Sequence, residues 1–320
     1  MAIIAGIDEA GYGPLLGPLV VTGVVFEVPD DQADACLWEL LSQSVTRRPT
    51  RKDLRLPVLD SKKLHARGKG IESLERTALG MLQSSLPAPD SFAGLLQRVA
   101  PHALQDMQNY PWYADLKLDL PVEADSGVVA TQANAVRRNA RAAGVRLAAV
   151  ISEPLLEGHY NRLVSNTRNK AVVLMGLTLR IVQRIIERAA GAPVRVYADR
   201  QGGRCRYLDP LMRAFEGFEF QILEESDGRS AYRLTRSPAR HDIEFCTSGE
   251  DKHLPTALAS VFSKYLRELF MRGFNQYWSG RVNALRPTAG YYTDAQRFLK
   301  DIAQAVSKEG IDRAQLVRMR

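Results

Sequence analysis

Two adjacent carboxylates follow an apolar segment at the start of the chain. Residues 3–7 are apolar and partly β-branched, which is typical of a buried strand, and Asp8 and Glu9 come directly after them. Buried carboxylates are costly unless a cation pairs with them, and Mg²⁺ prefers oxygen ligands of this kind. The following loop contains Gly11 and Gly13, which let backbone N–H groups approach a ligand closely. The pattern fits a metal site, and a plain polar turn after a strand is the alternative.

A second segment repeats this design. Residues 194–198 are typical of an apolar strand, Asp199 stands at its carboxyl end, and two glycines follow shortly after. Ligands of α/β sheets bind beyond the carboxyl ends of the strands, so Asp8 and Asp199 are expected at one edge of a sheet. Because neighbouring strand residues point to opposite faces, Asp8 and Glu9 can share a site only if the strand breaks at Glu9.

A predicted helix over residues 254–278 is a third source of carboxylate, and in it Lys264 and Glu268 lie one turn apart. Four carboxylates around two cations suit two-metal phosphodiester hydrolysis. In that reaction one ion lowers the pKa of the attacking water and the other stabilises the leaving 3′ oxygen. The spacing permits such a site for the four acidic residues named so far, without proving it.

The elements that must position these residues are strands and helices in mixed order. Further apolar runs predict strands at 19–28, 145–152, 218–223 and 243–246. Helical spacing and caps predict helices at 30–44, from residue 60 or 61 to about 82, at 131–143, 167–190 and 254–278, and one or two amphipathic helices from 293 onward. Residues 86–143 otherwise look irregular and are interpreted as an insertion. We expect an α/β chain.

The composition indicates an anionic partner and a cytoplasmic location. The 320 residues include 43 Lys and Arg against 36 Asp and Glu, and the net charge of +7 favours a partner such as nucleic acid. Three separated cysteines support neither a disulfide framework nor a zinc knuckle. We expect no signal peptide, because Asp8 and Glu9 interrupt the N-terminal apolar run, and no apolar stretch approaches the roughly 20 residues of a membrane span.

Basic residues occur where phosphates could bind. Asp60 or Ser61 is a natural N-cap, yet Lys62 and Lys63 occupy the first helical turn, against the helix dipole. Their presence suggests a phosphate held near that helix N-terminus. The loop at 46–56 carries five Arg and Lys residues, for which a solvated loop and phosphate contact are equally good interpretations.

Five motifs resemble those of the type 2 ribonucleases H (ribonuclease HII), and they fall in the family's order. They are Gly6-Ile7-Asp8-Glu9-Ala10-Gly11-Tyr12-Gly13-Pro14 with Gly17-Pro18, Asp60-Ser61-Lys62-Lys63-Leu64, Val196-Tyr197-Ala198-Asp199, the helical segment from Ala257 to Glu268, and Gly290-Tyr291-Tyr292-Thr293. The matches span residues 3 to about 300, and residues 86–143 are not covered.

This resemblance implies a ribonuclease H-like fold, with a mixed central β-sheet flanked by helices and with C-terminal helices. We expect a catalytic domain at 1–285 and a helical extension at 286–320. The implied activity is cleavage of the RNA strand of RNA/DNA hybrids, or of ribonucleotide-containing DNA, with 5′-phosphate and 3′-hydroxyl products. It requires two Mg²⁺ or Mn²⁺ ions and no organic cofactor, and we expect a monomer without membrane contact.

The resemblance also assigns roles to residues. Asp8, Glu9, Asp199 and Glu268 would be the catalytic metal ligands: Asp8 would bridge both ions, Glu9 and Asp199 would complete one site each, and Glu268 would hold the ion that activates water. The remaining candidates would bind substrate. Gly11, Tyr12 and Gly13 would approach the ribose 2′-hydroxyl, Lys62 and Lys63 would hold phosphates, Lys264 would also contact the substrate, and Tyr291 would stack near the scissile junction.

Three positions differ from the family pattern. Tyr12 stands where the family has Arg, which removes a cation near the junction and bears on cleavage at single ribonucleotides embedded in DNA. Glu268 replaces Asp and is one methylene longer, which would shift the second metal site, toward Mn²⁺. Tyr292 stands where a glycine is expected. We expect no N-terminal substrate-binding domain of the kind found in type 3 enzymes, because the motif begins at residue 3.

Other interpretations stay open to different degrees. A dinucleotide site is disfavoured, because the glycine spacing is wrong and the two preceding acids would repel a pyrophosphate. The alternatives are a nuclease of the same superfamily acting on another nucleic-acid structure, and a nucleic-acid-binding protein that has lost catalysis. His253 is a candidate phosphate or proton contact, whereas Trp112 and Tyr113 either stack on nucleotides or pack in the core, with packing favoured.

Overall fold

The computed structural model describes residues 1–65 and 70–319. Within these residues, the centre is a seven-stranded sheet in the order β5-β2-β1-β6-β9-β8-β7. The strands are β1 Ala2–Ala10, β2 Leu19–Val28, β5 Arg146–Leu155, β6 Val194–Asp199, β7 Glu219–Glu225, β8 Arg229–Arg236 and β9 Ala239–Cys246. β6 pairs in parallel with both β1 and β9, and the other neighbours are antiparallel. The mixed central sheet predicted from the sequence is confirmed.

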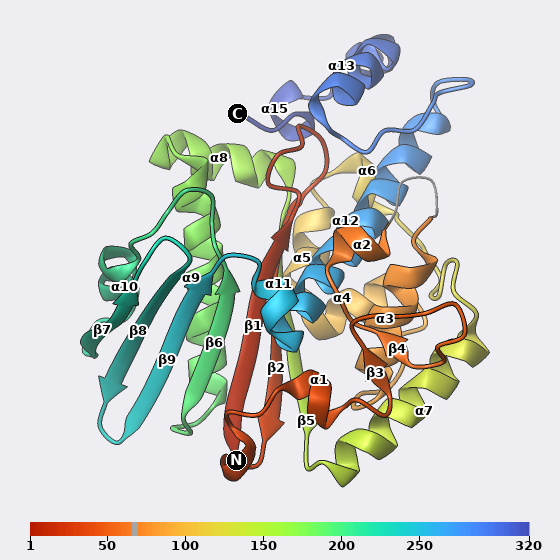
Figure 1. Ribbon diagram of the computed structural model, residues 1–320. Helices are drawn as coiled ribbons and strands as arrows, with labels where there is room; N and C mark the ends of the chain where they lie inside the picture. The colour runs from red at the N-terminus through yellow and green to blue at the C-terminus, as the bar shows by residue number, and fades with distance from the viewer. Residues whose placement is uncertain (66–69, 320) are drawn as a thin grey trace.

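Helices cover both faces of this sheet (Figure 1). The long helix α12 Leu254–Ser279 packs against β1 and β2 on one face. The helices α8 Glu157–Thr167 and α9 Lys170–Arg188 lie on the other. Side chains of β1 alternate between the two cores: Ile4 belongs to the α12 side, whereas Ile3 and Ala5 belong to the α9 side.

The remaining elements are α-helices and one pair of very short strands. They are α1 Leu37–Leu40, α2 Ser61–Leu64, α3 Glu72–Gln83, α4 Phe92–Val99, α5 Pro101–Met107, α6 Pro111–Ala114, α7 Ser126–Ala142, α10 Leu208–Ala214, α11 Gly249–Lys252, α13 Tyr292–Asp301, α14 Ala303–Lys308 and α15 Arg313–Leu316, with the paired strands β3 Val45–Thr46 and β4 Leu56–Pro57. In Figure 1, α13 and α15 lie beyond the end of β1, beside the loop that follows it. None of the helices in the described part of the chain is long and apolar enough to span a membrane.

Some predicted elements differ from those observed. The helix predicted from residue 60 or 61 to about 82 is divided into α2 and α3, and part of it, residues 66–69, lies outside the described residues. Gly70 precedes α3 with φ +66°, a conformation that interrupts a helix. The segment 86–143, expected to be largely irregular, contains α4 to α7. The sequence did not predict α8 or β8.

The segment 86–143 packs into the α12-side core. Trp112 and Tyr113 are 2% and 0% exposed, and the Trp112 ring contacts Phe274 and Trp278 of α12, so the packing interpretation of these aromatic residues is confirmed. The buried Glu75 carboxylate of α3 adds a polar connection. It accepts hydrogen bonds from the backbone N–H groups of residues 122–124 and from the Tyr265 hydroxyl of α12 at 2.7–2.8 Å.

The start of α12 lies directly on β1, and Gly6 permits this contact. A Cβ at Gly6 would lie 2.0 Å from the backbone nitrogen of Thr256 and 2.2 Å from the carbonyl carbon of Pro255. Asp8 lies two residues further along β1 on the same face, and the Ser263 hydroxyl of α12 donates to its backbone carbonyl at 3.0 Å. The absence of a side chain at Gly6 therefore determines how closely α12 approaches Asp8.

Gly6→Ala should lower the midpoint of thermal unfolding, because the new methyl group would meet backbone atoms that cannot rotate away, and overpacking of this kind costs about 1–3 kcal/mol. Gly176→Ala is the control. Gly176 lies in α9, and a Cβ there would have nothing within 4 Å, so alanine at this position should leave the midpoint unchanged or raise it. Equal midpoints for Gly6→Ala and the wild type would contradict the close contact.

Candidate active site

A cavity of about 240 Å³ lies at the carboxyl ends of β1 and β6. Its walls contain most of the residues that the sequence analysis selected. They are Asp8, Glu9, Gly11, Tyr12, Gly13, Lys62, Asp199, Lys264 and Tyr291, and they are joined by Ala10, Pro14, Ser61, Glu250, Ser260 and Arg267. The structure thus brings together segments from both ends of the chain.

Asp8 and Glu9 share the cavity although β1 continues past Glu9, contrary to the expectation from the sequence. β1 does not break at Glu9: its pairing with β2 continues to Ala10. Its pairing with β6 instead ends at Ile7, one residue before Asp8. The edge of β1 is therefore open beside both carboxylates. The Asp8 side chain accepts a hydrogen bond from the N–H of the next residue, Glu9, at 2.7 Å.

The carboxyl groups repel one another in a partly buried space. Burial raises the pKa of Asp8, and the charges of Glu9 and Asp199 raise it further, against a hydrogen bond from Ser260. Burial and Asp199 likewise raise the pKa of Glu9 to about 7, opposed by Lys62. Burial also raises the pKa of Asp199, although the Gly249 N–H donates to it at 3.0 Å. Each of these acids therefore holds its proton more strongly than an isolated carboxyl group does, and a cation among them would oppose that effect.

Glu250 belongs to the cavity and was not selected from the sequence. It lies in α11, four residues after β9 ends at Cys246, and β9 is the parallel neighbour of β6. Carboxyl ends of parallel strands meet at one edge of a sheet, so an acid shortly after this strand was a signal that could have identified it. Burial and the charge of Asp199 raise the pKa of Glu250.

Two predicted residues do not face the cavity. Glu268 forms an ion pair with Lys264, with 2.6 Å between Oε1 and Nζ, and Lys264 but not Glu268 is among the described residues that line the cavity. Lys63 forms an ion pair with Asp251 at 2.7 Å, and both side chains are more than half exposed. The neighbouring Lys62, by contrast, lines the cavity from an exposed position.

A buried arginine near the C-terminus holds the glycine loop. The guanidinium of Arg318, which is 2% exposed, donates to the carbonyl oxygens of Gly11 at 2.5 Å and Tyr12 at 3.1 Å. It lies 4.2 Å from the centroid of the Tyr160 ring, and its backbone N–H donates to the Leu15 carbonyl at 2.8 Å. Asn161 of α8 fixes the same segment by accepting from the Met319 N–H at 2.7 Å.

A second buried arginine, Arg267 of α12, holds the other end of this loop. It donates to the carbonyl oxygens of Leu16 at 3.1 Å and Ala289 at 3.0 Å. Gly11 passes so close that a Cβ would lie 2.6 Å from Arg267 Nε, and its φ of +87° also favours glycine. The Gly290 carbonyl accepts from the N–H of Leu15 at 2.8 Å.

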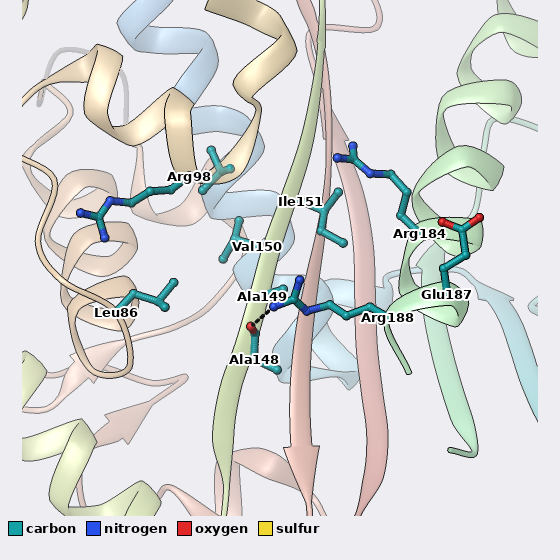
Figure 2. A pocket seen from close by; sticks show the side chains of 10 residues that line it. Leu86, Arg98, Ala148, Ala149, Val150, Ile151, Arg184, Glu187 and Arg188 are labelled. Atoms are coloured by element: carbon teal, nitrogen blue, oxygen red, sulfur yellow. Dashed lines mark hydrogen bonds between the residues drawn. The ribbon is translucent and has the colours of Figure 1, made fainter. Parts of the chain in front are cut away.

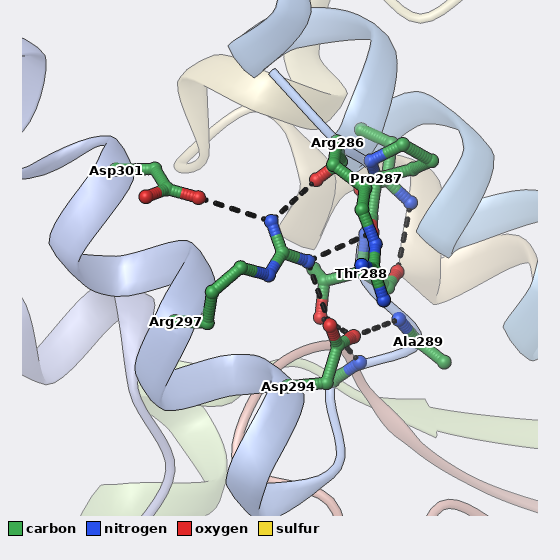
Figure 3. Close-up of polar contacts among 9 residues, drawn as sticks. Arg286, Pro287, Thr288, Ala289, Asp294, Arg297 and Asp301 are labelled. Atoms are coloured by element: carbon green, nitrogen blue, oxygen red, sulfur yellow. Dashed lines mark hydrogen bonds and ion pairs between the residues drawn. The ribbon is translucent and has the colours of Figure 1, made fainter.

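The segment that presents Ala289 and Gly290 is itself fixed by α13 (Figure 3). Arg297 donates to the carbonyl oxygens of Arg286 and Pro287, at 2.8 and 3.0 Å. Asp294 accepts from the Thr288 hydroxyl at 2.6 Å and from the Ala289 N–H at 3.1 Å. The C-terminal helices therefore determine the shape of the glycine loop at the other end of the chain.

A lysine lies over the ring of Tyr12. Lys170, the first residue of α9, places its Nζ 4.9 Å from the centroid of the Tyr12 ring, and Tyr12 lines the cavity. A cation from a neighbouring helix therefore lies beside the glycine loop.

Two other features of the molecule have some character of a site. Glu244, Cys246 and His253 offer ligand atoms within 4.8 Å of one another, but Glu244 pairs with Arg229 at 2.8 Å and the His253 ring stacks on Tyr197. A larger cavity, of about 590 Å³, lies along the edge strand β5 (Figure 2). Arginines from α4 and α9 surround it, and Glu187 is the single carboxylate among the described residues that line it. Neither feature repeats the carboxylate cluster at the end of β1.

No protein-family model and no curated protein matches this chain. Among solved structures, it is similar to ribonuclease HII of Archaeoglobus fulgidus in its complex with PCNA, at 15% identity and a TM-score of 0.46, over 99% of this chain and 94% of that one. It is also similar to Bst-RNase HIII in complex with Mn²⁺, at 15% identity and a TM-score of 0.43, over 99% of this chain and 66% of that one. For ribonuclease H2 from Pyrococcus horikoshii OT3 the values are 11% and 0.41, over 98% and 92%.

Arg318→Met should loosen the glycine loop, because the loop carbonyls lose their donor and the buried charge near Glu157 is removed. Removing one partner of a buried charged network typically costs about 3–5 kcal/mol. Hydrogen–deuterium exchange should be faster at the amides of Leu15 and Leu16 than in the wild type. Arg313→Met, an exposed residue of the same C-terminal segment, is the matched control and should leave exchange at these amides unchanged. Equal exchange in both variants would remove Arg318 from the support of the loop.

Proposed function

We propose that this protein is a divergent ribonuclease H-type endonuclease of the type 2 and type 3 group. It would cleave the RNA strand of RNA/DNA hybrids and leave 5′-phosphate and 3′-hydroxyl ends. The observation that carries the proposal is the grouping of Asp8, Glu9 and Asp199 in one cavity with the glycine loop of the family-like motif. The positive net charge of the chain is consistent with a nucleic-acid substrate.

The donor set of the cavity fits Mg²⁺ or Mn²⁺. Its acidic walls offer carboxylate oxygens, the ligands that hard divalent cations prefer. Burial raises the pKa values of Asp8, Glu9 and Asp199, and neighbouring carboxylates raise those of Asp8 and Glu9 further, an effect that a cation would oppose. Two such ions would supply an activated water and stabilise the leaving 3′ oxygen. Asp8, between Glu9 and Asp199 in this electrostatic cluster, would contribute to both ions, and its two neighbours to one each.

The basic and aromatic walls of the cavity support the substrate roles. Lys62 is exposed at the cavity and would hold a phosphate of the cleaved strand. The backbone of Gly11 to Gly13, fixed by Arg318, would approach the ribose 2′-hydroxyl, which distinguishes RNA from DNA. Tyr291 lines the cavity with 54% of its surface exposed, which leaves its ring available to stack on a nucleotide.

The proposed catalytic domain at 1–285 and extension at 286–320 are separated by their position in the sequence. Arg318 and Gly290 of the extension contact the glycine loop, so the extension would contribute to the active site.

Cleavage of labelled duplexes tests the proposal. The substrates are an RNA/DNA hybrid, a DNA duplex with one ribonucleotide, and an all-DNA duplex, each with Mg²⁺ or Mn²⁺. The wild type should cleave ribonucleotide-containing strands alone, and Asp8→Asn should lower the rate by at least about 10³-fold while retaining hybrid binding, because the ligand charge is lost but the basic surface is not. The proposal would be overturned if the all-DNA duplex were cleaved equally or if no duplex were cleaved. Turnover by Asp8→Asn would remove Asp8 from the mechanism.

The junction preference gives a second test. Tyr12→Arg should raise cleavage at a single embedded ribonucleotide relative to a continuous hybrid, because it restores a cation on the loop itself. Tyr12→Phe keeps the ring beside Lys170 and serves as the control, with the substrate preference of the wild type. An unchanged preference in Tyr12→Arg would contradict the role assigned to this loop position.

A further inference from the structure

Three different metal-binding groups meet where β9 ends and α12 begins. A carboxylate oxygen of Glu244, Sγ of Cys246 and an imidazole nitrogen of His253 all lie within 4.8 Å of one another. Glu244 and Cys246 are two residues apart in β9, so their side chains leave the strand on the same face. A thiol, an imidazole and a carboxylate are the ligands of zinc sites, whereas Mg²⁺ prefers oxygen alone.

The separations fit a zinc ion after small side-chain movements. Bonds of about 2.0–2.3 Å in a tetrahedral site place the ligand atoms roughly 3.3–3.8 Å apart. The 4.8 Å limit of this cluster exceeds that spacing by about 1 Å, a distance that side-chain rotation can close. Three protein ligands leave the fourth position of the tetrahedron to a water molecule.

The surrounding structure holds Cys246 and His253 in place and leaves their metal-binding atoms available. Cys246 is a free cysteine and is fully buried. The His253 ring stacks on Tyr197, with the ring centroids 3.7 Å apart and the planes at 8°. This contact uses the face of the imidazole and leaves its two nitrogens at the ring edge. Burial lowers the pKa of His253, which favours the neutral imidazole that binds metals.

The ion pair between Glu244 and Arg229 is compatible with a zinc ion. Arg229 Nη2 lies 2.8 Å from Oε2 of Glu244, so the pair engages one of the two carboxylate oxygens. The same guanidinium also pairs with Glu224, which would keep it paired if Glu244 turned toward a metal. A Zn²⁺ ion with one thiolate and one carboxylate is neutral, and so is the remaining pair of Arg229 and Glu224. The charges therefore balance.

We propose that Glu244, Cys246 and His253 bind a Zn²⁺ ion, and that this ion ties the end of β9 to the start of α12. The segment between these ligands contains Gly249, whose N–H donates to Asp199 at 3.0 Å. A Cβ at Gly249 would lie 3.4 Å from Cys246 Sγ, so the ion would stabilise this backbone directly. The proposal is independent of the proposed function, because none of the three ligands is among the described residues that line the carboxylate cavity.

The test uses Co²⁺, which takes the place of Zn²⁺ in such sites and gives a thiolate-to-metal charge-transfer band in the near ultraviolet. The metal-free, full-length protein is titrated with Co²⁺ in a reducing buffer with excess Mg²⁺, which competes for oxygen ligands but not for a thiolate. The wild type should develop the band with one equivalent of Co²⁺, and Zn²⁺ should then abolish it. Cys246→Ser should give no band, whereas Cys205→Ser, which changes a cysteine outside the cluster, is the matched control and should keep it.

Two further variants keep the thiol and test the other ligands, also in the event that Cys246→Ser does not fold. Glu244→Gln and His253→Gln should each weaken Co²⁺ binding by at least about tenfold. Zn²⁺ in excess should raise the midpoint of thermal unfolding of the wild type by about 3 °C or more and leave that of His253→Gln unchanged.

A wild type without the charge-transfer band would overturn the proposal, and so would a band that survives in Cys246→Ser. Unchanged Co²⁺ affinity in both Glu244→Gln and His253→Gln would overturn the ligand set. A Zn²⁺-bound wild type with an unchanged unfolding midpoint would overturn the tie between β9 and α12. These outcomes leave the proposed nuclease function untouched, because cleavage of labelled duplexes tests it separately.

Discussion

The crowding of carboxyl groups at the ends of β1 and β6 is the constraint on which the surrounding structure depends. Burial raises the pKa values of Asp8, Glu9 and Asp199, and repulsion from neighbouring carboxylates raises those of Asp8 and Glu9 further, so these side chains would separate if their backbone were free to move. Close backbone contacts prevent this. Gly6 allows α12 to lie on β1, and the Gly249 N–H fixes Asp199. The carboxylates are thus placed by packing before any cation binds, which lowers the reorganisation that binding requires.

Buried charges also fix the glycine loop, but here they are the positive charges of two arginines. Arg267 and Arg318 are buried, and a buried cation is costly unless it is hydrogen-bonded. Both donate to carbonyl oxygens of the loop, and Glu157 nearby supplies a counter-charge. Burial raises the pKa of Glu157 to about 7, and the Gly17 N–H and Arg318 oppose this rise. The loop conformation and the burial of two arginines therefore stabilise each other. This explains how a loop rich in glycine can be well ordered.

The parts of the site that could be predicted from the sequence are those with a local pattern. Apolar runs ending in Asp8 and Asp199 identified two strand ends, and the rule that ligands bind at carboxyl ends placed them together. Glu250 was missed because it follows the end of its strand by four residues, and its recognition also required the parallel pairing of β9 with β6, which no local pattern specifies. Arg318 is 307 residues from the carbonyl of Gly11 that it holds, and nothing in its neighbourhood marks it.

The spacing of Lys264 and Glu268 shows how one pattern supports two interpretations. Residues four apart on a helix form one face, which can present a ligand to a cavity, but the same spacing is that of a helical ion pair. Here the ion pair prevails. Both side chains are mostly shielded from solvent, at 16% and 18% exposure, so their attraction is weakly screened, and separating them would leave a lysine unpaired at the cavity wall. The Glu268 carboxylate reaches Lys264 directly. The helical ion pair therefore neutralises the charge of Glu268 within α12, whereas Glu250 of α11 lines the cavity.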